Sequence, residues 1–149
     1  MHSGQSQRGF SLVEAMVSLV VISVGMIGIA ALYGQGLTAG RTALFRTQAV
    51  NLVADMADRI RANRGAGIGY NAAPADNNCD TGGAPCLPNA MAAHDLWLWT
   101  TQVATQLPGG FGTVQVVDGI PPTYTVQVSW QEGVLAPSVY QAVFQVPAF

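Results

Sequence analysis

The first feature of the chain is an unbroken apolar block from Phe10 to Tyr33, in which Glu14 is the only charged residue. The block contains no proline, and as one helix it would reach roughly 36 Å, at about 1.5 Å per residue. That length is enough for a hydrocarbon core of about 30 Å. The block is longer than the core of a secretory signal, and no small-residue cleavage pattern closes it. The pattern predicts a transmembrane helix over residues 10–33.

Beyond this block the pattern changes to a single apolar stripe at helical spacing. Its members recur at intervals of three, four and seven residues: Leu37, Leu44, Phe45, Ala49, Leu52, Met56 and Ile60. Two ion pairs are expected on the wetter side of the stripe, Asp55 with Arg59 and Asp58 with Arg61. We therefore expect the same helix to continue as an amphipathic segment over residues 34–64, with a soluble head on its apolar face.

The remaining residues, 65–149, predict a small globular head. Residues 65–93 are rich in turn formers and show no sustained periodicity, which indicates a loop. A short helix is expected over residues 95–107, with Asp95 as its N-cap and a Pro-Gly-Gly stop after it. Alternation at period two predicts three strands, at about 112–118, 123–131 and 138–147. The expected fold class is α+β, a long N-terminal helix packed on a small antiparallel sheet.

Composition and charge exclude several classes of function. The net charge is −2, and the only basic residues besides histidine are six arginines, so a nucleic-acid surface is not expected. The chain contains no lysine, and no glycine-rich loop has a phosphate-binding spacing with one. His94 has no nucleophile beside it in the sequence, and Trp97 and Trp99 are expected to be packing anchors. We expect no catalytic residues, no cofactor and no metal, and a protein that is not an enzyme.

The only two cysteines, Cys79 and Cys86, lie within the predicted loop. A disulfide between them would close a small ring and stabilise the head by about 2–3 kcal/mol. A metal site is the competing interpretation, but the Cys-x6-Cys spacing is not that of a zinc finger, and no second Cys or His pair follows. A disulfide would indicate an oxidising compartment.

The segment Gly9-Phe10-Ser11-Leu12-Val13-Glu14 resembles the prepilin signal of type IV pilins and of the pseudopilins of type II secretion. The resemblance implies that residues 1–9 are a leader, which a prepilin peptidase removes between Gly9 and Phe10 before it methylates the new amino terminus. It also implies a single-pass protein of the inner membrane, with a cytoplasmic N-terminus and a periplasmic head, which is assembled into a cell-surface pilus.

For Glu14, the resemblance implies a role in the axial register of assembly. A carboxylate in hydrocarbon costs on the order of 2.5–3.5 kcal/mol, so such a residue normally has a partner. In the family that partner is the positively charged amino terminus of a neighbouring subunit. The alternative is that Glu14 lies near enough to the interface to reach water or to be protonated, without any partner.

A closer resemblance is to PilV-type minor pilins. It is carried by the segment 55–64, Asp-Met-Ala-Asp-Arg-Ile-Arg-Ala-Asn-Arg, and by shorter matches at 95–99, 107–110 and 126–130. It implies a minor pilin that acts with other minor pilins and the major pilin to initiate or cap the pilus, and so supports twitching motility and adhesion. Two alternatives stay open, a minor pseudopilin of a type II secretion system and a tip adhesin that binds a ligand through residues 65–93.

Overall fold

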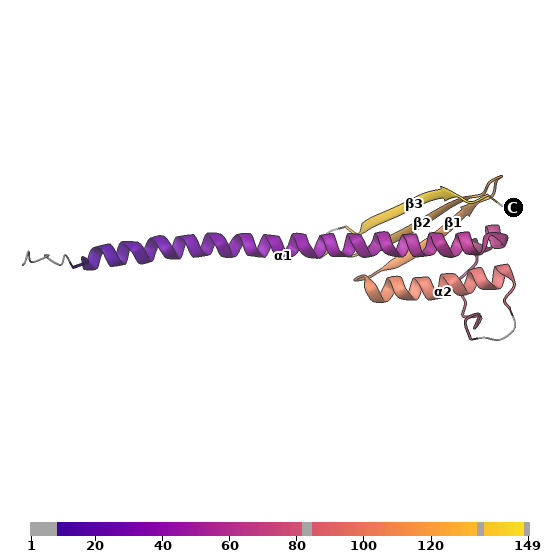
Figure 1. The fold of residues 1–149 in the computed structure, drawn as a ribbon, viewed down its shortest axis with the longest axis horizontal. Helices are drawn as coiled ribbons and strands as arrows, with labels where there is room; N and C mark the ends of the chain where they lie inside the picture. The colour runs from indigo at the N-terminus through magenta and orange to yellow at the C-terminus, as the bar shows by residue number, and fades with distance from the viewer. Residues whose placement is uncertain (1–8, 82–84, 134–135, 148–149) are drawn as a thin grey trace, which may run out of the picture. The chain divides into compact units, whose positions relative to one another are not determined.

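The structure is a computed structural model that describes residues 9–81, 85–133 and 136–147. Along the chain the elements are α1 (Leu12–Ala62), η1 (Arg64–Asn71), α2 (Pro88–Gln106), β1 (Phe111–Val117), β2 (Thr123–Trp130) and β3 (Ser138–Gln145), as Figure 1 shows. The chain divides into two compact units, residues 1–41 and 42–149, which are described separately. The expected leader lies outside the described residues except for Gly9.

The first unit contains the N-terminal part of α1. Every described residue from Gly9 to Arg41 is exposed, and the helix contains a window apolar enough to span a membrane, none of it buried. The hydroxyls of Ser18, Ser23 and Thr38 donate to carbonyl oxygens four residues earlier, at 2.8, 2.7 and 3.1 Å. These bonds satisfy the hydroxyls within the helix, as an apolar environment requires. The segment therefore suits burial in lipid or among other helices.

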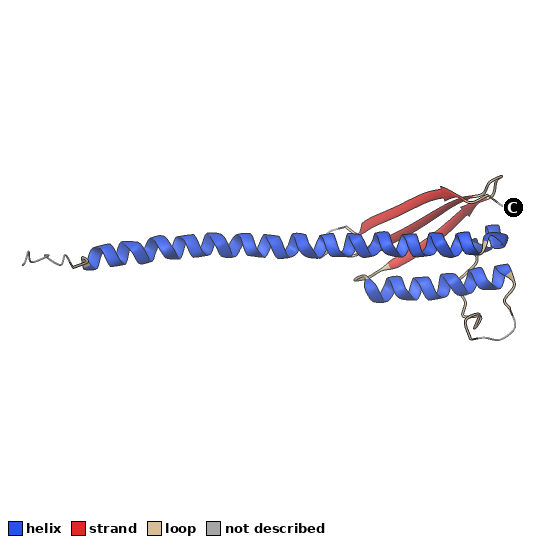
Figure 2. Cartoon of the chain, viewed as in Figure 1, coloured by secondary structure: helices blue, strands red, loops and turns tan. Residues whose placement is uncertain are grey.

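In the second unit, the C-terminal part of α1 lies beside α2 and against the sheet (Figures 1 and 2). Its buried side chains continue the predicted stripe: Ala49, Leu52, Val53, Met56, Ala57 and Ile60. The prediction is wrong for Leu37 and Leu44, which are exposed, and Phe45 is only partly buried. Periodicity marks the apolar face of a helix, but it does not mark where the head begins to cover that face.

Trp99 of α2 joins the helices to the sheet. Its side chain has no exposed surface, and its indole N–H donates to the carbonyl oxygen of Leu52 in α1 at 2.8 Å. On the other side the ring packs over Gly112 of β1, where a Cβ atom would lie 2.5 Å from Cζ3. Trp99 is thus a packing anchor, as predicted. Trp97, two residues earlier, is exposed and lies outside the core.

The sheet is an antiparallel meander in the order β1-β2-β3, as the sequence predicts. Side chains of the central strand β2 alternate between buried and half-buried positions. The register aligns inward residues in rows across the three strands, among them Val114–Val126–Ala142 and Val116–Tyr124–Phe144. The rings of Tyr124 and Phe144 stack with their centroids 5.8 Å apart. Tyr140, which the alternation also placed on the buried face, is exposed.

A side chain occupies part of the outer edge of β1. The amide of Asn71, at the end of η1, donates to the carbonyl oxygen of Val116 at 2.9 Å and accepts from the Val116 N–H at 2.7 Å. This pair of bonds reproduces the exchange that a neighbouring strand would make. It attaches η1 to the sheet.

Two predicted boundaries are wrong. The helix expected over residues 95–107 begins at Pro88 and ends at Gln106, so Asp95 lies inside it and is not its N-cap. Proline suits the first helical position, since its missing N–H has no partner there, and the alanines that follow are strong helix formers. The expected loop 65–93 therefore contains the start of α2, and it also contains most of η1, which bends at Gly67, where φ is 49°.

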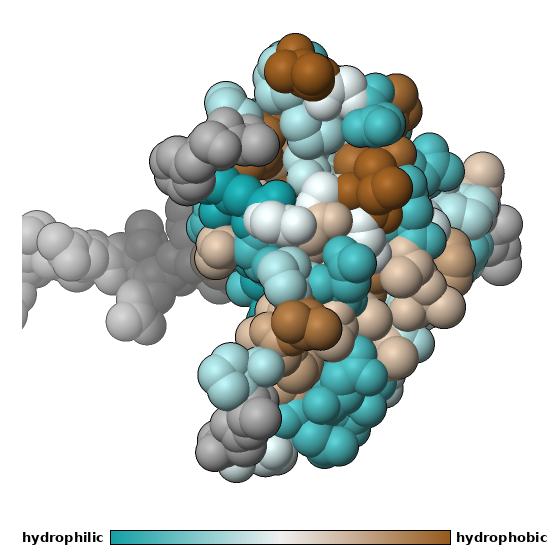
Figure 3. Space-filling view, turned by 90° about the vertical axis from the view of Figure 1, so that its right-hand side faces the viewer, coloured by the Kyte–Doolittle hydropathy of each residue, from teal (hydrophilic) through white to brown (hydrophobic). Residues whose placement is uncertain are grey.

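Large hydrophobic side chains on the second unit are scattered. The exposed ones in η1, the loops and the sheet are Ile68, Leu87, Phe111, Val117, Ile120, Val139, Tyr140 and Val143. Figure 3, which views the unit end-on, shows separate brown groups among teal and pale residues. Single exposed apolar residues are normal on a soluble surface, so this face by itself does not indicate a binding site.

Candidate assembly site and head network

The N-terminal candidate residues lie at the start of α1. Gly9 and Phe10 precede the helix, and the Phe10 side chain is 84% exposed. The carbonyl oxygen of Ser11 accepts from the N–H groups of Glu14 and Ala15, at 3.0 and 3.2 Å, and so forms the first turn. Glu14 belongs to that turn, where a negative charge interacts favourably with the helix dipole.

The Glu14 carboxylate is exposed, and among the described residues no cationic group lies within 4 Å of it. The next described cation along the chain is Arg41, 27 residues further (41 − 14 = 27). An isolated carboxylate is costly in hydrocarbon, so Glu14 in a membrane would need either a positive partner from outside the described residues or a position near enough to the interface to reach water.

In the head, a charged network joins α1, η1 and α2. Arg59 Nε donates to Asp55 Oδ2 at 2.9 Å, and its Nη1 donates to Asp95 Oδ1 at 3.4 Å. The hydroxyl of Tyr70 donates to Asp95 Oδ2 at 2.9 Å. Asp95 is buried, so these two donors supply the bonds that its carboxylate loses on leaving water. The predicted pairs Asp55–Arg59 and Asp58–Arg61 are both present.

The network shifts the proton equilibria of two of its members. Burial raises the pKa of Tyr70, and the negative charge of Asp95 raises it further. For Arg59, burial by itself lowers the pKa, but the hydrogen bond and charge of Asp55, together with the charge of Asp95, outweigh burial and raise it. Both shifts favour a protonated donor facing a charged Asp95.

The Tyr70 shift predicts a loss of stability in alkali. Because the folded pKa lies above the unfolded value of about 10, this contribution is complete below pH 10 and is lost as the pH rises toward the folded pKa. In urea unfolding between pH 9 and 11, the free energy of unfolding should fall less steeply with pH in Tyr70→Phe than in the wild type. The difference between the two slopes should correspond to about one proton per molecule.

The control for this prediction is Tyr140→Phe, since Tyr140 lies on the exposed part of β3. That variant should keep the wild-type dependence on pH. An alkaline decline in Tyr70→Phe as steep as in the wild type would show that Tyr70 does not carry the effect.

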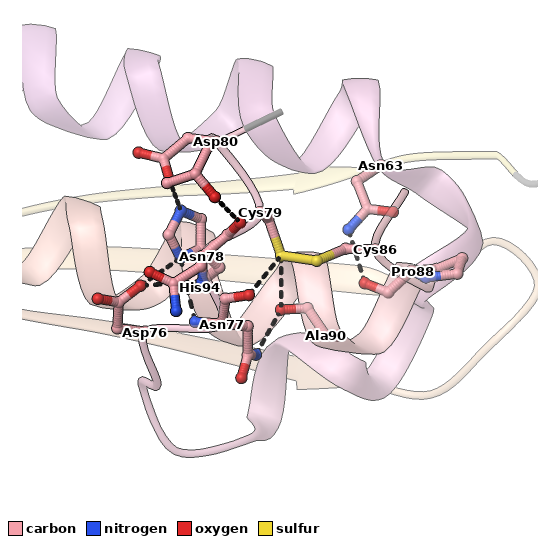
Figure 4. Close-up of a disulfide and its surroundings, with 11 residues drawn as sticks. Asn63, Asp76, Asn77, Asn78, Cys79, Asp80, Cys86, Pro88, Ala90 and His94 are labelled. Carbon is pink, nitrogen blue, oxygen red and sulfur yellow. Dashed lines mark hydrogen bonds and ion pairs between the residues drawn. A yellow bond between two sulfur atoms is a disulfide. The ribbon is translucent and has the colours of Figure 1, made fainter. Parts of the chain in front are cut away.

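The predicted disulfide between Cys79 and Cys86 is present (Figure 4). Cys79 Sγ lies 3.9 Å from the carbonyl oxygen of Ala90 in the first turns of α2. The bridge therefore fixes the loop before α2 close to the start of that helix. Among the described residues no group of three or more His, Cys, Asp or Glu side chains is placed to hold a metal ion.

Comparison with known families gives two matches that together cover residues 4–97. A model described as the prokaryotic N-terminal methylation motif matches residues 4–30, which include Gly9, Phe10 and Glu14. A second model, described as type IV pilin Tt1218, matches residues 31–97, from α1 into α2. The chain is a type IV pilin. No curated protein and no solved structure matches it.

Membership of this family explains the two different parts of α1. A pilin with an N-terminal methylation motif is a substrate of a prepilin peptidase, is anchored in a membrane by its apolar helix, and assembles with other pilus components. Its role is structural, and the family is not a family of catalysts. The exposed apolar helix and the packed head are the parts that this role requires.

Several residues that hold the pilin head together were not predicted. Glu132 accepts from Trp130 Nε1 at 2.6 Å and from Thr42 Oγ1 at 3.0 Å, and so ties the end of β2 to α1. Asp95 was interpreted as a cap, while Tyr70 and Asn71 were assigned to a loop. The pairs Tyr70–Asp95, Asn71–Val116 and Thr42–Glu132 are 25, 45 and 90 residues apart in sequence. Only Pro88 before an alanine-rich run could have revealed the longer α2.

Proposed function

We propose that this pilin is a minor, PilV-type subunit that acts with other minor pilins to initiate or cap the type IV pilus, and so supports twitching motility and adhesion. The single observation that carries the assembly role is the first unit, an apolar helix exposed along its described length with one acidic residue in its first turn. The resemblance of residues 55–64 to the end of the long helix in PilV-type pilins supports the minor role.

The mechanism follows from the chemistry of the helix ends. Cleavage between Gly9 and Phe10 would create a positive amino terminus at Phe10, which methylation leaves charged. A neighbouring subunit's amino terminus placed near Glu14 would gain on the order of 4 kcal/mol at 4 Å and an intermediate dielectric. Because the rest of the segment is apolar, this pair would set the axial register of the helices, and the glycines of α1, with no atom within 4 Å of their Cβ positions, would allow close packing.

The proposed topology is a single pass through the inner membrane with the N-terminus in the cytoplasm and the head in the periplasm. The disulfide supports this orientation, since disulfides persist in the periplasm and are rare in the cytosol.

Mass spectrometry of sheared surface filaments and of the inner-membrane fraction tests the proposal. We expect a peptide beginning at N-methylated Phe10 in both fractions, and in the filaments at a small fraction of the major pilin. Two results together would support a type II pseudopilin and contradict the pilus role. The peptide would be found in membranes alone, and deletion of the protein would abolish enzyme secretion while pili stay normal. An intact leader in both fractions would contradict processing.

A further inference from the structure

His94 of α2 is buried beneath the disulfide loop and lies between two carboxylates (Figure 4). Its side chain is 2% exposed, Nδ1 lies 3.3 Å from Asp76 Oδ1, and Nε2 lies 3.5 Å from Asp80 Oδ1. Both acids belong to the loop, one on each side of Cys79. A single imidazole therefore faces the loop through both of its nitrogen atoms.

The neutral imidazole satisfies this arrangement poorly. The backbone N–H of Asn77 donates to Nδ1 at 3.3 Å, so Nδ1 is an acceptor and the proton lies on Nε2. Nε2 has no hydrogen-bond partner, because 3.5 Å to Asp80 is too long for a good bond. The lone pair of Nδ1 also faces the negative Asp76 carboxylate. A buried polar atom without a partner is costly, so neutral His94 holds the loop weakly.

We propose that His94 is a proton-operated latch that holds the disulfide loop against α2. Uptake of one proton from solvent gives the ring an N–H at both nitrogens. Nε2–H then donates to the Asp80 carboxylate and Nδ1–H donates to the Asp76 carboxylate. The Asn77 N–H loses its acceptor on the ring and donates to water instead. Loss of the proton returns the loop to its weaker attachment. No covalent bond changes, and the inference does not rest on the minor-pilin role.

The groups that contact His94 belong to the loop and to α2, so a change in the charge of His94 acts mainly on the loop. Within the described part of the chain, the titratable groups that face the ring are Asp76 and Asp80, and Trp97 of α2 stacks on it at 5.8 Å between ring centres. The neighbouring Asp95 belongs to the separate network of Arg59 and Tyr70. Histidine is the side chain that ordinarily changes charge between pH 5 and 8, which is the range a cell-surface protein meets.

A divalent transition metal is the rival explanation for an unpartnered buried nitrogen next to a carboxylate. The described residues favour the proton, because Asp76 and Asp80 lie on opposite nitrogens of the ring and the described chain places no third ligating side chain beside either pair. Adding EDTA or Zn²⁺ to the same experiment distinguishes the two.

The test is amide hydrogen exchange by NMR on the full mature chain in detergent micelles with EDTA, corrected for intrinsic exchange. Protection of Ala75, Asn78 and Thr81, whose N–H groups donate to Ala93 O, Asp76 Oδ1 and Asn78 O, should be at least about threefold higher at pH 5.5 than at pH 8, with a midpoint that follows the His94 ring signals. His94→Gln should remove this difference. Asp80→Asn, at an exposed position, should reduce it, and Asp118→Asn on the distant β1–β2 turn should leave it unchanged.

Three outcomes would overturn the latch. One is a His94→Gln variant whose loop protection differs between pH 5.5 and pH 8 as much as in the wild type. If His94→Gln does not fold, the same result in Asp80→Asn overturns the latch. Another is loop protection that does not change with pH in the wild type. The third is a difference that appears only with Zn²⁺ and vanishes in EDTA, which would assign the site to a metal.

Discussion

Replacing Glu14 with alanine should reduce incorporation of this pilin into filaments at least tenfold, while cleavage after Gly9 and methylation of Phe10 continue. A tenfold loss corresponds to about 1.4 kcal/mol, well below the 4 kcal/mol or so expected for a charge pair at 4 Å in an intermediate dielectric. The carboxylate has no cationic partner among the described residues, so its removal should cost the isolated subunit little. Quantitative mass spectrometry of sheared filaments and membranes measures both quantities.

Glu14→Gln separates charge from shape, and it should behave like Glu14→Ala. Thr38→Val is the matched control, since Thr38 lies in the same exposed unit and its hydroxyl bonds only within the helix. That variant should assemble normally. Wild-type incorporation of Glu14→Ala would refute the register role and favour the alternative in which the carboxylate reaches the interface unpaired.

Replacing Trp99 with alanine should destabilise the head by about 3–5 kcal/mol, the usual cost of removing a fully buried aromatic side chain. The change opens a cavity between α1, α2 and β1, and it leaves the carbonyl oxygen of Leu52 without its indole donor. Urea unfolding followed by far-UV circular dichroism measures the loss, and wild-type and variant should show similar helix content before the transition.

Trp97→Ala is the matched control, because it removes the same side chain from an exposed position two residues away in the same helix. It should cost less than about 1.5 kcal/mol, mainly through the lost stacking on His94. Equal losses in the two variants would mean that Trp99 is not the anchor.

The strongly periodic elements could be predicted from the sequence. The apolar block and the stripe from Ala49 to Ile60 identify α1, and alternation along β2 identifies the centre of the sheet, because both patterns come directly from burial on one face. The start of α2 was missed because its first turns carry proline, asparagine and alanines, with Met91 as their single large apolar residue. Its inward side chains there are small, so no stripe is visible.

In the candidate site, the disulfide could be predicted from the sequence, but the hydrogen-bond and ion-pair partners of the charged residues could not. Cys79 and Cys86 have no other cysteine to pair with, so composition alone favoured their bond. The contacts of Asp95 and His94 could not be predicted, because their partners, Tyr70 and Asp80 among them, come from segments whose placement depends on the folded head. For Glu14, the cost of a carboxylate in hydrocarbon predicts a positive partner, but no described residue supplies one, so the sequence of a single chain does not name it.

The amide of Asn71 has a consequence for how these subunits can associate. Open sheet edges are templates for the addition of further strands, and proteins kept at high local concentration must avoid that route to aggregation. With its outer edge occupied at Val116, β1 cannot accept a strand along its second half without losing two hydrogen bonds. Strand addition along this half of β1 is thus disfavoured, which limits sheet-to-sheet growth and favours polymerisation through the helices.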